Sequence, residues 1–409
     1  MKGDGMSDRA SKRPRLLFIH PGPIPPYHDA RRNALSHLAE RFDGDLVTVT
    51  WESRATVRAR RAADREALGG FGYHATSSTF QPDAVRLVWE FLFFFLRGLG
   101  LSLRHGRYDV VVAYGPFKTG LAAWLIARLT GSRLVLEVPG NPRRSFTFDG
   151  SAVTRVKRWL ADRMIPFMLS RADHLHLLYP TQIDGLYAAP PERVSVFHNF
   201  VPLSLLPEPA GDDGFVMFLG YPWKLKGVDL LIPAFRSVAP KYPGVRLVIM
   251  GHCPDRTEFE ALAAGDPSIE LLKAVPHEQA MALMARCRIF VLPSRTEAMG
   301  RVLLEAMSMG KTCIASAVDG IPHYLRDGEN GLLFRSEDVA DLARQLDRAL
   351  GDPALARRLG ERARDVALSA YSEGEYVARF AEMIGQTLQL TPPESRRTVG
   401  REAEAPAPS

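Results

Sequence analysis

The sequence predicts an α/β protein made of two doubly wound domains, each with a parallel sheet covered by helices. Short apolar runs alternate with helix-forming segments over residues 15–200, and the same alternation resumes over residues 215–371. This alternation favours parallel strands that are joined by crossover helices. Residues 202–214 are rich in proline, glycine and acidic side chains, which predicts a linker between the two halves. A chain of 409 residues is long for one domain and sufficient for two.

The first domain is expected to span residues 14–201. Its strands are expected at residues 15–20, 46–50, 108–114, 133–138, 173–178 and 194–197, and two of its helices at 29–41 and 118–129. Each expected strand is a short apolar run bounded by turn-forming residues. Residues 1–13 are polar and basic without an apolar core, so we expect a disordered tail there and no secretory signal.

The second domain is expected to span residues 215–371. Its strands are expected at residues 215–219, 246–250, 269–272, 288–292 and 312–316, and two of its helices at 301–309 and 337–350. A further helical segment is expected at residues 372–390. Residues 391–409 consist largely of Pro, Glu, Arg and Ala, which predicts a disordered tail.

Two glutamates in the stretch from Val291 to Phe334 indicate a ligand-binding site. Glu305 lies in a helix that is otherwise apolar on most sides, and a buried carboxylate needs hydrogen-bond donors. The two hydroxyls of a ribose would satisfy it. Glu297 lies in the preceding loop, where the N–H groups of Met299, Gly300 and Arg301 at the helix start form an anion site. A nucleoside diphosphate sugar fits all three features, whereas a helix cap at Glu297 and a salt bridge at Glu305 are the structural alternative.

This stretch resembles the nucleotide-sugar signature of family 4 glycosyltransferases. The matching residues are Pro293-Ser294, Glu297, Glu305-Ala306-Met307 after seven further residues, Gly310, Gly320, Asp327-Gly328 and Gly331. The resemblance extends over residues 15–390 and is stronger in the second half. It implies the GT-B architecture, in which two Rossmann-like domains face a cleft. The first domain would then bind the acceptor, the second the nucleotide sugar, and residues 372–390 would cross back to the first.

The resemblance also implies roles for individual residues. Glu297 is expected to contact the donor sugar and to act in catalysis together with Lys226, and Glu305 is expected to hold the ribose. Val275, next to Pro276, is expected to edge the base pocket. The complete set of expected donor-binding residues is Gly220, Tyr221, Lys224, Lys226, Val275, Glu297, Met299, Gly300, Arg301 and Glu305.

The chain departs from the family pattern at two places. Many family members have Glu-Val-His-Gly-Asp after a first-domain strand, but this chain has Glu137-Val-Pro139-Gly-Asn141, and proline cannot donate or accept a proton. The family also usually has Gly-Arg and then Lys-Gly after the first strand of the second domain. Here Tyr221 follows Gly220, so one of two diphosphate-binding cations is missing. Lys224 would replace it if the loop were extended, because alternate residues then point the same way; otherwise Lys224 is an exposed loop charge.

We expect no metal and no cofactor. Asp43-Gly44-Asp45 has the form of a metal-binding Asp-x-Asp motif, but Asp-Gly is also ordinary turn chemistry before a strand at residues 46–50. Cys253, Cys287 and Cys313 show neither paired nor metal-ligand spacing, so we interpret them as reduced core residues of a cytoplasmic protein.

The expected function is retaining transfer of a sugar from a UDP- or GDP-sugar to a glycan or lipid-linked acceptor, as in envelope polysaccharide synthesis. No enzymic nucleophile is evident, which favours front-face departure with the donor phosphate accepting the acceptor's proton. Two alternatives stay open: a GT-B sugar-nucleotide epimerase, and a non-catalytic nucleotide-sugar-binding protein, for which Pro139 and Tyr221 are the arguments.

The charge distribution suggests a membrane partner. The net charge is +6, residues 53–66 are rich in arginine, and residues 87–103 contain Trp89 and four phenylalanines. The longest apolar run in this segment is far shorter than the ~20 residues of a membrane span. We expect a buried helix there, with an interfacial helix as the alternative. Peripheral attachment to the inner face of the cell membrane is expected, and no nucleic-acid partner.

Overall fold

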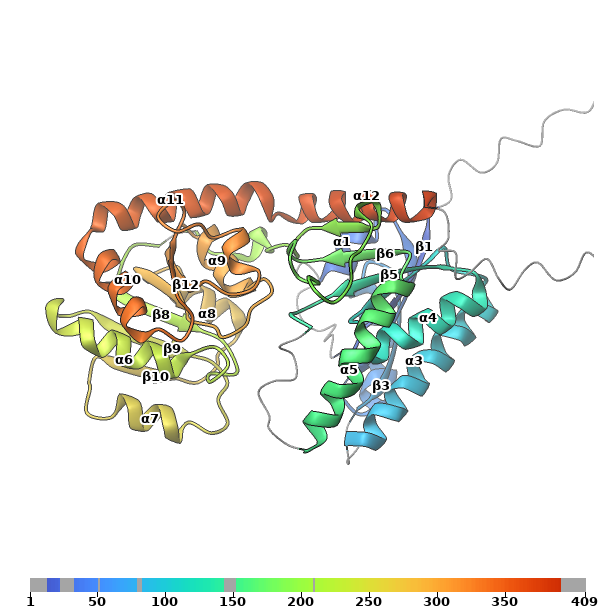
Figure 1. Ribbon diagram of the computed structural model, residues 1–409, viewed down its shortest axis with the longest axis horizontal. Helices are drawn as coiled ribbons and strands as arrows, with labels where there is room; N and C mark the ends of the chain where they lie inside the picture. Colours follow the sequence, from blue (N-terminus) through green and yellow to red (C-terminus); the bar gives the residue numbers. More distant parts are fainter. Residues whose placement is uncertain are drawn as a thin grey trace, which may run out of the picture.

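The computed structural model describes residues 13–22, 33–50, 52–78, 83–142, 152–208 and 210–390. Within them it contains two parallel sheets, one in each half of the chain (Figure 1). The fold class predicted from the sequence is confirmed. The expected tails at 1–13 and 391–409 lie almost entirely outside the described residues.

The first sheet has seven strands in the order β3-β2-β1-β4-β5-β6-β7. Their bounds are β1 Arg15–Ile19, β2 Asp43–Thr50, β3 Gly72–Ser77, β4 Val110–Tyr114, β5 Arg133–Val138, β6 His174–Leu177 and β7 Val194–Val196. The helices of this half are α1 Ala34–Leu38, α2 Arg54–Ala67, α3 Asp83–His105, α4 Lys118–Thr130 and α5 Ala152–Arg171. The six expected strands are present, and the edge strand β3 was not predicted.

Both faces of the first sheet are covered, as parallel sheets require. Leu17 and Ile19 of β1 pack into one core cluster with α3, α4 and α5, whereas Leu16 and Phe18 pack into another with α1 and α12. Successive residues of a strand point to opposite faces, so an unbroken apolar run is what a strand buried on both sides needs.

The second sheet has six strands in the order β10-β9-β8-β11-β12-β13. Their bounds are β8 Phe215–Leu219, β9 Arg246–Met250, β10 Ile269–Leu272, β11 Ile289–Leu292, β12 Thr312–Ser316 and β13 Leu332–Phe334. The helices are α6 Val228–Val238, α7 Thr257–Ala263, α8 His277–Met284, α9 Arg301–Ser308, α10 Val339–Gly351, α11 Pro353–Ala370 and α12 Glu373–Gln389. The strand, loop, helix and strand expected around Glu297 and Glu305 are β11, α9 and β12.

The last helix joins the two halves. In Figure 1, α11 lies over the second sheet and α12 continues the line across the first. Phe380 of α12 is fully buried and packs on Phe18 of β1, with ring centroids 6.1 Å apart, and on Phe42, at 5.9 Å.

Two expectations about local structure were wrong. Asp43 and Asp45 do not lie in a turn before the second strand, because β2 begins at Asp43 and pairs it with Arg15 of β1. The helix expected at 29–41 ends at Leu38 as α1, and its first part lies outside the described residues.

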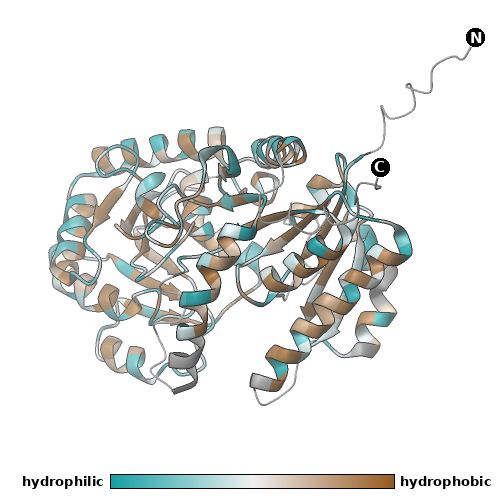
Figure 2. Cartoon of the chain, turned by 45° about the vertical axis from the view of Figure 1, so that its right-hand side comes forward, coloured by the Kyte–Doolittle hydropathy of each residue, from teal (hydrophilic) through white to brown (hydrophobic). Residues whose placement is uncertain are grey.

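The helix expected to be buried, α3, is buried on one side only. Phe94 and Leu101 are in the core, but Val85, Val88, Leu92, Leu96 and Leu103 are each at least 42% exposed. In Figure 2 this helix, at the lower right, is largely coloured as hydrophobic. No helix in the described part of the chain combines the length and apolar character of a bilayer span.

Candidate active site

The loops that carry the expected donor-binding residues lie at one edge of the second sheet. They follow β8, β10 and β11, and in a parallel sheet the carboxyl ends of all strands meet at the same edge. β8 and β11 are hydrogen-bonded neighbours, so the loop with Lys226 lies beside the loop with Glu297.

Lys226 and Glu297 form an ion pair between these two loops. The Lys226 ammonium donates to the Glu297 carboxylate, and both side chains are mostly buried. The hydroxyl of Ser294 lies 3.5 Å from the same carboxylate oxygen. The loops approach closely at Gly227, where φ is +74° and a Cβ would lie 1.9 Å from the Pro293 carbonyl oxygen. Only glycine combines this conformation with this contact.

The start of α9 offers free backbone donors beside this pair. Gly300 is the N-terminal cap residue, with φ +63°, and its carbonyl accepts from Leu303 and Leu304. Within the described part of the chain, the N–H groups of Met299, Gly300 and Arg301 have no hydrogen-bond acceptor. A helix start with unused N–H groups attracts anions. The anion site expected from the sequence stays a prediction, and these N–H groups are the donors that it would use.

Glu305 has a protein partner, as the structural alternative expected, but the sequence did not identify which residue it is. It is 1% exposed, and its Oε1 lies 3.0 Å from Nε2 of His277, the first residue of α8. The residues of α9 alone offered no donor, because His277 comes from a different element. Val275 lies two residues before His277, just ahead of α8, and is 38% exposed. The one signal in the sequence for this partner was that a histidine directly follows Val275-Pro276, the segment expected to edge the base pocket.

Lys224 is not placed as an extended loop would place it. The segment turns, because the N–H of Lys226 donates to Pro222 and that of Gly227 donates to Lys224. The Lys224 ammonium binds Asp229, at 3.0 Å, and Glu258. Hydrogen bonds to Glu258 and then to Asp229 raise the pKa of Lys224. The loop is therefore not extended, so the condition for Lys224 to share a face with Lys226 is not met. Lys224 is 58% exposed, as the alternative of an exposed loop charge expected.

Tyr221, the residue in place of the expected arginine, is 53% exposed. Its ring lies 5.3 Å from that of His252, in the loop after β9. Gly220 precedes it directly after β8, and its N–H donates to Met250. Tyr221 thus brings an aromatic surface and a hydroxyl to this edge of the sheet, but no charge.

The first domain meets the second near Glu297. Asn141, in the loop after β5, donates from Nδ2 to Oδ1 of Asp319 at 2.6 Å. The same loop is held by Gln182, which is buried and donates to the carbonyls of Val138 and Gly140 at 2.6 and 2.8 Å. Pro139 is therefore part of a loop that is fixed on the first domain and faces the second.

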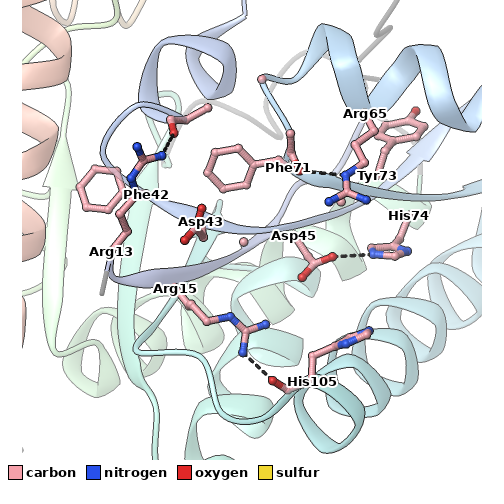
Figure 3. Close-up of a pocket in the computed structure, with 15 residues that line it drawn as sticks. Arg13, Arg15, Phe42, Asp43, Asp45, Arg65, Phe71, Tyr73, His74 and His105 are labelled. Carbon is pink, nitrogen blue, oxygen red and sulfur yellow. Dashed lines mark hydrogen bonds and ion pairs between the residues drawn. The ribbon is translucent and has the colours of Figure 1, made fainter. Parts of the chain in front are cut away.

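A cavity of about 630 Å³ lies elsewhere, at the amino ends of β1, β2 and β3 (Figure 3). Its arginines bind backbone carbonyls near the carboxyl ends of three helices: Arg13 binds Ala39, Arg15 binds His105 and Arg65 binds Gly70. Cations are stabilised at such helix ends. These arginines therefore have a structural explanation.

Asp45 lines this cavity and belongs to the Asp-x-Asp motif. Its carboxylate binds His74, at 2.8 Å, and the hydroxyl of Tyr108. Burial raises the pKa of Asp45, but the hydrogen bonds to His74 and Tyr108 outweigh it and leave that pKa below the usual value. Among the described residues, no group of three or more His, Cys, Asp or Glu side chains is arranged to hold a metal.

Comparison with known proteins gives the family of the chain. Two sequence-family models match the chain. The family described as glycosyl transferase 4-like domain matches residues 15–199, and the family described as glycosyl transferases group 1 matches residues 207–366. D-inositol 3-phosphate glycosyltransferase of Streptomyces coelicolor is 26% identical over 87% of this chain and 88% of its own. An exopolysaccharide phosphotransferase of the same organism is 39% identical, but over 34% of this chain and only 15% of its own length.

Solved structures share the whole architecture. Sucrose-phosphate synthase of Thermosynechococcus elongatus superposes with a TM-score of 0.72 at 18% identity, over 91% of this chain and 99% of its own. HepE of Anabaena in complex with UDP-glucose superposes with a TM-score of 0.66 at 15% identity, over 91% of this chain and 99% of its own. The two Rossmann-like domains therefore have the GT-B fold. The chain belongs to the family 4 glycosyltransferases, and it is an enzyme of that class.

Proposed function

We propose that this glycosyltransferase moves a sugar from a nucleoside diphosphate sugar to its acceptor with retention of anomeric configuration. The observation that carries the proposal is the Lys226–Glu297 pair beside the unused N–H groups at the start of α9. A cation and free N–H groups at one place suit a diphosphate leaving group, and a carboxylate next to them suits the hydroxyls of the sugar.

Each proposed role follows from a contact. Lys226 would turn from Glu297 to the diphosphate when the donor binds, which frees Glu297 for the donor sugar. The N–H groups of Met299, Gly300 and Arg301 would bind the phosphate oxygens. Stabilising the charge of the leaving group in this way is commonly the largest contribution to catalysis. Lys224 would add a second cation only after release from Asp229 and Glu258.

The nucleoside is proposed to lie between α8 and α9. Glu305 uses one oxygen for His277, which leaves the other for a ribose hydroxyl. Val275 would edge the base, and the partly exposed ring of Tyr221 would border the diphosphate. UDP- and GDP-sugars are the proposed donors. HepE, which has the same fold, is solved with UDP-glucose, and this supports a uridine nucleotide.

No metal is proposed in the reaction, because Lys226 and the start of α9 already supply positive potential at the diphosphate. No enzymic nucleophile is evident from the sequence, so front-face departure of the leaving group is the proposed route. The departing phosphate would accept the proton of the attacking hydroxyl.

The proposed acceptor is lipid-linked or an envelope polysaccharide intermediate, reached from the cytoplasmic face of a membrane. The exposed apolar face of α3 supports this, since the exposed positions between Val85 and Leu103 carry no charged residue. Arg104 and Arg107 follow at its carboxyl end and are exposed. The side chain of Phe94 points into the core, so aliphatic residues of α3, and not its aromatic cluster as a whole, would meet the lipid.

The decisive experiment measures donor hydrolysis and transfer across UDP-, GDP- and ADP-sugars, with and without a chelator. We expect one UDP- or GDP-sugar to be turned over in the chelator, with the product's anomeric configuration unchanged by NMR. Binding without turnover of any donor would indicate a non-catalytic nucleotide-sugar-binding protein. Isomerised donor without transfer would indicate an epimerase, and a soluble phosphorylated polyol as best acceptor would overturn the lipid-linked assignment.

A further inference from the structure

Asp319 occupies an unusual position in the loop after β12. Its φ is +44°, in the left-handed region that residues with a side chain seldom adopt. Asp and Asn are the side chains best tolerated there apart from glycine, because they can form local hydrogen bonds. A residue held in this conformation needs compensating contacts, and the Asp319 carboxylate has them on both oxygens.

One oxygen of Asp319 holds the loop that carries Glu297. Its Oδ2 accepts from the hydroxyl of Thr296 and from the backbone N–H of Glu297, the latter at 3.1 Å. The next residue adds a third contact, because the N–H of Gly320 donates to the Glu297 carbonyl at 3.1 Å. The backbone on either side of the Glu297 Cα is therefore set by the loop after β12.

The other oxygen of Asp319 reaches the first domain. Its Oδ1 accepts from Asn141 Nδ2 at 2.6 Å, and Asn141 lies on the loop that Gln182 holds against the end of β5. One carboxylate thus joins a first-domain loop to the backbone of Glu297.

The surroundings of this contact are tightly packed. A Cβ at Gly320 would lie 1.8 Å from the Ala298 carbonyl oxygen and 3.0 Å from the Tyr179 ring of the first domain. Tyr179 in turn stacks on His323, with centroids 5.6 Å apart. A shift between the domains at this interface would therefore be transmitted to residues 296–298, because closely packed groups leave no free space to absorb it.

We propose that Asp319 is a positioning residue that sets Glu297 for sugar transfer when the two domains are together, and that Asn141 is its partner in the first domain. The contact couples closure of the domains to the placement of Glu297. This rests on the proposed function for what Glu297 does, whereas the contact itself does not depend on that function.

The chemistry of the pair allows a rescue experiment. In Asn141→Asp, two carboxylates would face each other, and like charges at hydrogen-bond distance repel. In the double variant Asn141→Asp/Asp319→Asn, the amide and the carboxylate exchange sides. The amide introduced at position 319 would still accept from Glu297 and Thr296 through its oxygen, and its Nδ2 would donate to the carboxylate introduced at position 141. Asparagine also tolerates the positive φ at this position.

We expect kcat of Asn141→Asp to fall at least ~10-fold, the loss typical of a broken hydrogen bond to a charged group. Its Kd for UDP should stay within about twofold, because the proposed nucleotide contacts lie in the second domain. The fall in kcat should be smaller for Asp319→Asn than for Asn141→Asp, because the Asn141 amide can turn and offer its oxygen as an acceptor. The double variant should return to within about threefold of the parent.

Small-angle X-ray scattering of the same proteins with UDP tests the coupling without turnover. Asn141→Asp should show a larger radius of gyration than the parent, and the double variant should not. A parental kcat and radius for Asn141→Asp, or a double variant as impaired as Asn141→Asp, would overturn the proposal. If no protein turns over any donor, the proposed function has failed, while the scattering comparison still decides whether the contact holds the domains together.

Discussion

At the scale of single residues, the candidate active site is a set of carboxylates with partners from other elements. Glu305 is buried against His277, Glu297 pairs with Lys226, and Asp319 spans the two domains. Buried carboxylates need such partners, because an unpaired charge in the interior is costly. A bound ligand could replace these protein partners, so substitutions at these pairs test the proposed ligand contacts directly.

Glu305→Gln should weaken binding of UDP. The amide would present an N–H₂ group to His277 or to the ribose where the carboxylate accepts, and a lost hydrogen bond to a charged group costs roughly 1–3 kcal/mol. Calorimetric titration with UDP measures this. Glu329→Gln is the control, since Glu329 is exposed and pairs with Arg326 at the surface. Equal UDP affinity in a folded Glu305→Gln protein would refute the ribose assignment.

Lys226→Ala should reduce kcat by roughly 100-fold or more, as expected when charge stabilisation of a leaving group is lost. Lys224→Ala is the matched variant, because the same side chain is removed two residues earlier. Because Lys224 is already paired with two carboxylates, Lys224→Ala should reduce kcat less than tenfold, which is a change in activation free energy below ~1.4 kcal/mol. Steady-state kinetics with the preferred donor compare the two, and a loss of tenfold or more in Lys224→Ala would restore it as the second diphosphate cation.

Acid should destabilise the fold through buried histidines. Burial, followed by the proximity of His176, lowers the pKa of both His174 and His198 to about 4. The folded state therefore binds fewer protons than the unfolded one between about pH 6.5 and pH 4, so stability is complete above pH 6.5 and falls as the pH drops through this range. We expect the free energy of unfolding to fall by roughly 1–2 kcal/mol per histidine from pH 7 to pH 5. Guanidinium denaturation at the two pH values measures it, and equal stability would contradict these pKa directions.

At the scale of elements, α3 differs from an ordinary surface helix because its exposed side is apolar. One side packs Phe94 and Leu101 into the core, and the other presents a row of aliphatic residues. A surface helix of a soluble domain normally turns charged or polar residues outward. Arginines at nearby exposed positions give the α3 side of the domain the combination that interfacial helices use.

Leu92→Glu/Leu96→Glu should abolish binding to anionic liposomes at low salt. Each glutamate replaces exposed apolar area with a charge that anionic lipid repels. Flotation with vesicles of phosphatidylglycerol and phosphatidylcholine is the measurement. Leu368→Glu, at a similarly exposed leucine on α11, is the control and should float like the parent. A parent protein that stays in the aqueous fraction, or a double variant that still floats, would rule out α3 as the lipid-facing surface.

At the scale of the whole molecule, α12 attaches the end of the second half to the first domain. It carries Tyr376, Phe380, Met383 and Ile384 into a core cluster of the first sheet. The two domains are therefore joined twice, once through the segment after β7 and once through α12. Two connections restrict how the domains can move relative to each other.

Phe380→Ala should destabilise the first domain by about 3–5 kcal/mol, the usual cost of removing a buried phenylalanine. The ring contacts with Phe18 and Phe42 would be lost and a cavity left behind. Leu388→Ala on the same helix is the control, because Leu388 is partly exposed and should cost much less. Guanidinium denaturation gives both values, and similar stability of the two variants would show that α12 contributes little to the first domain.

Much of the architecture could be predicted from the sequence for one reason. Strands of a parallel sheet are buried on both faces, so they are continuous apolar runs such as Leu16–Ile19 and Phe215–Leu219, which stand out against polar helix surfaces. β3 was missed because Gly72–Ser77 is an edge strand with polar residues and a glycine. The helix α11 was missed because its Arg-rich sequence shows only a thin apolar stripe.

The sequence by itself determined which residues carry the candidate chemistry, because Glu297, Glu305 and the glycine of the α9 start are local features of one loop and one helix. Their partners were decided only by the tertiary structure. His277 is 28 residues from Glu305, Lys226 is 71 from Glu297, and Asn141 is 178 from Asp319. Such pairs form because strand order brings β8 beside β11 and because α12 and the linker bring the domains together. Neither arrangement leaves a periodic trace in the sequence, since it depends on which surfaces pack and not on how residues are spaced.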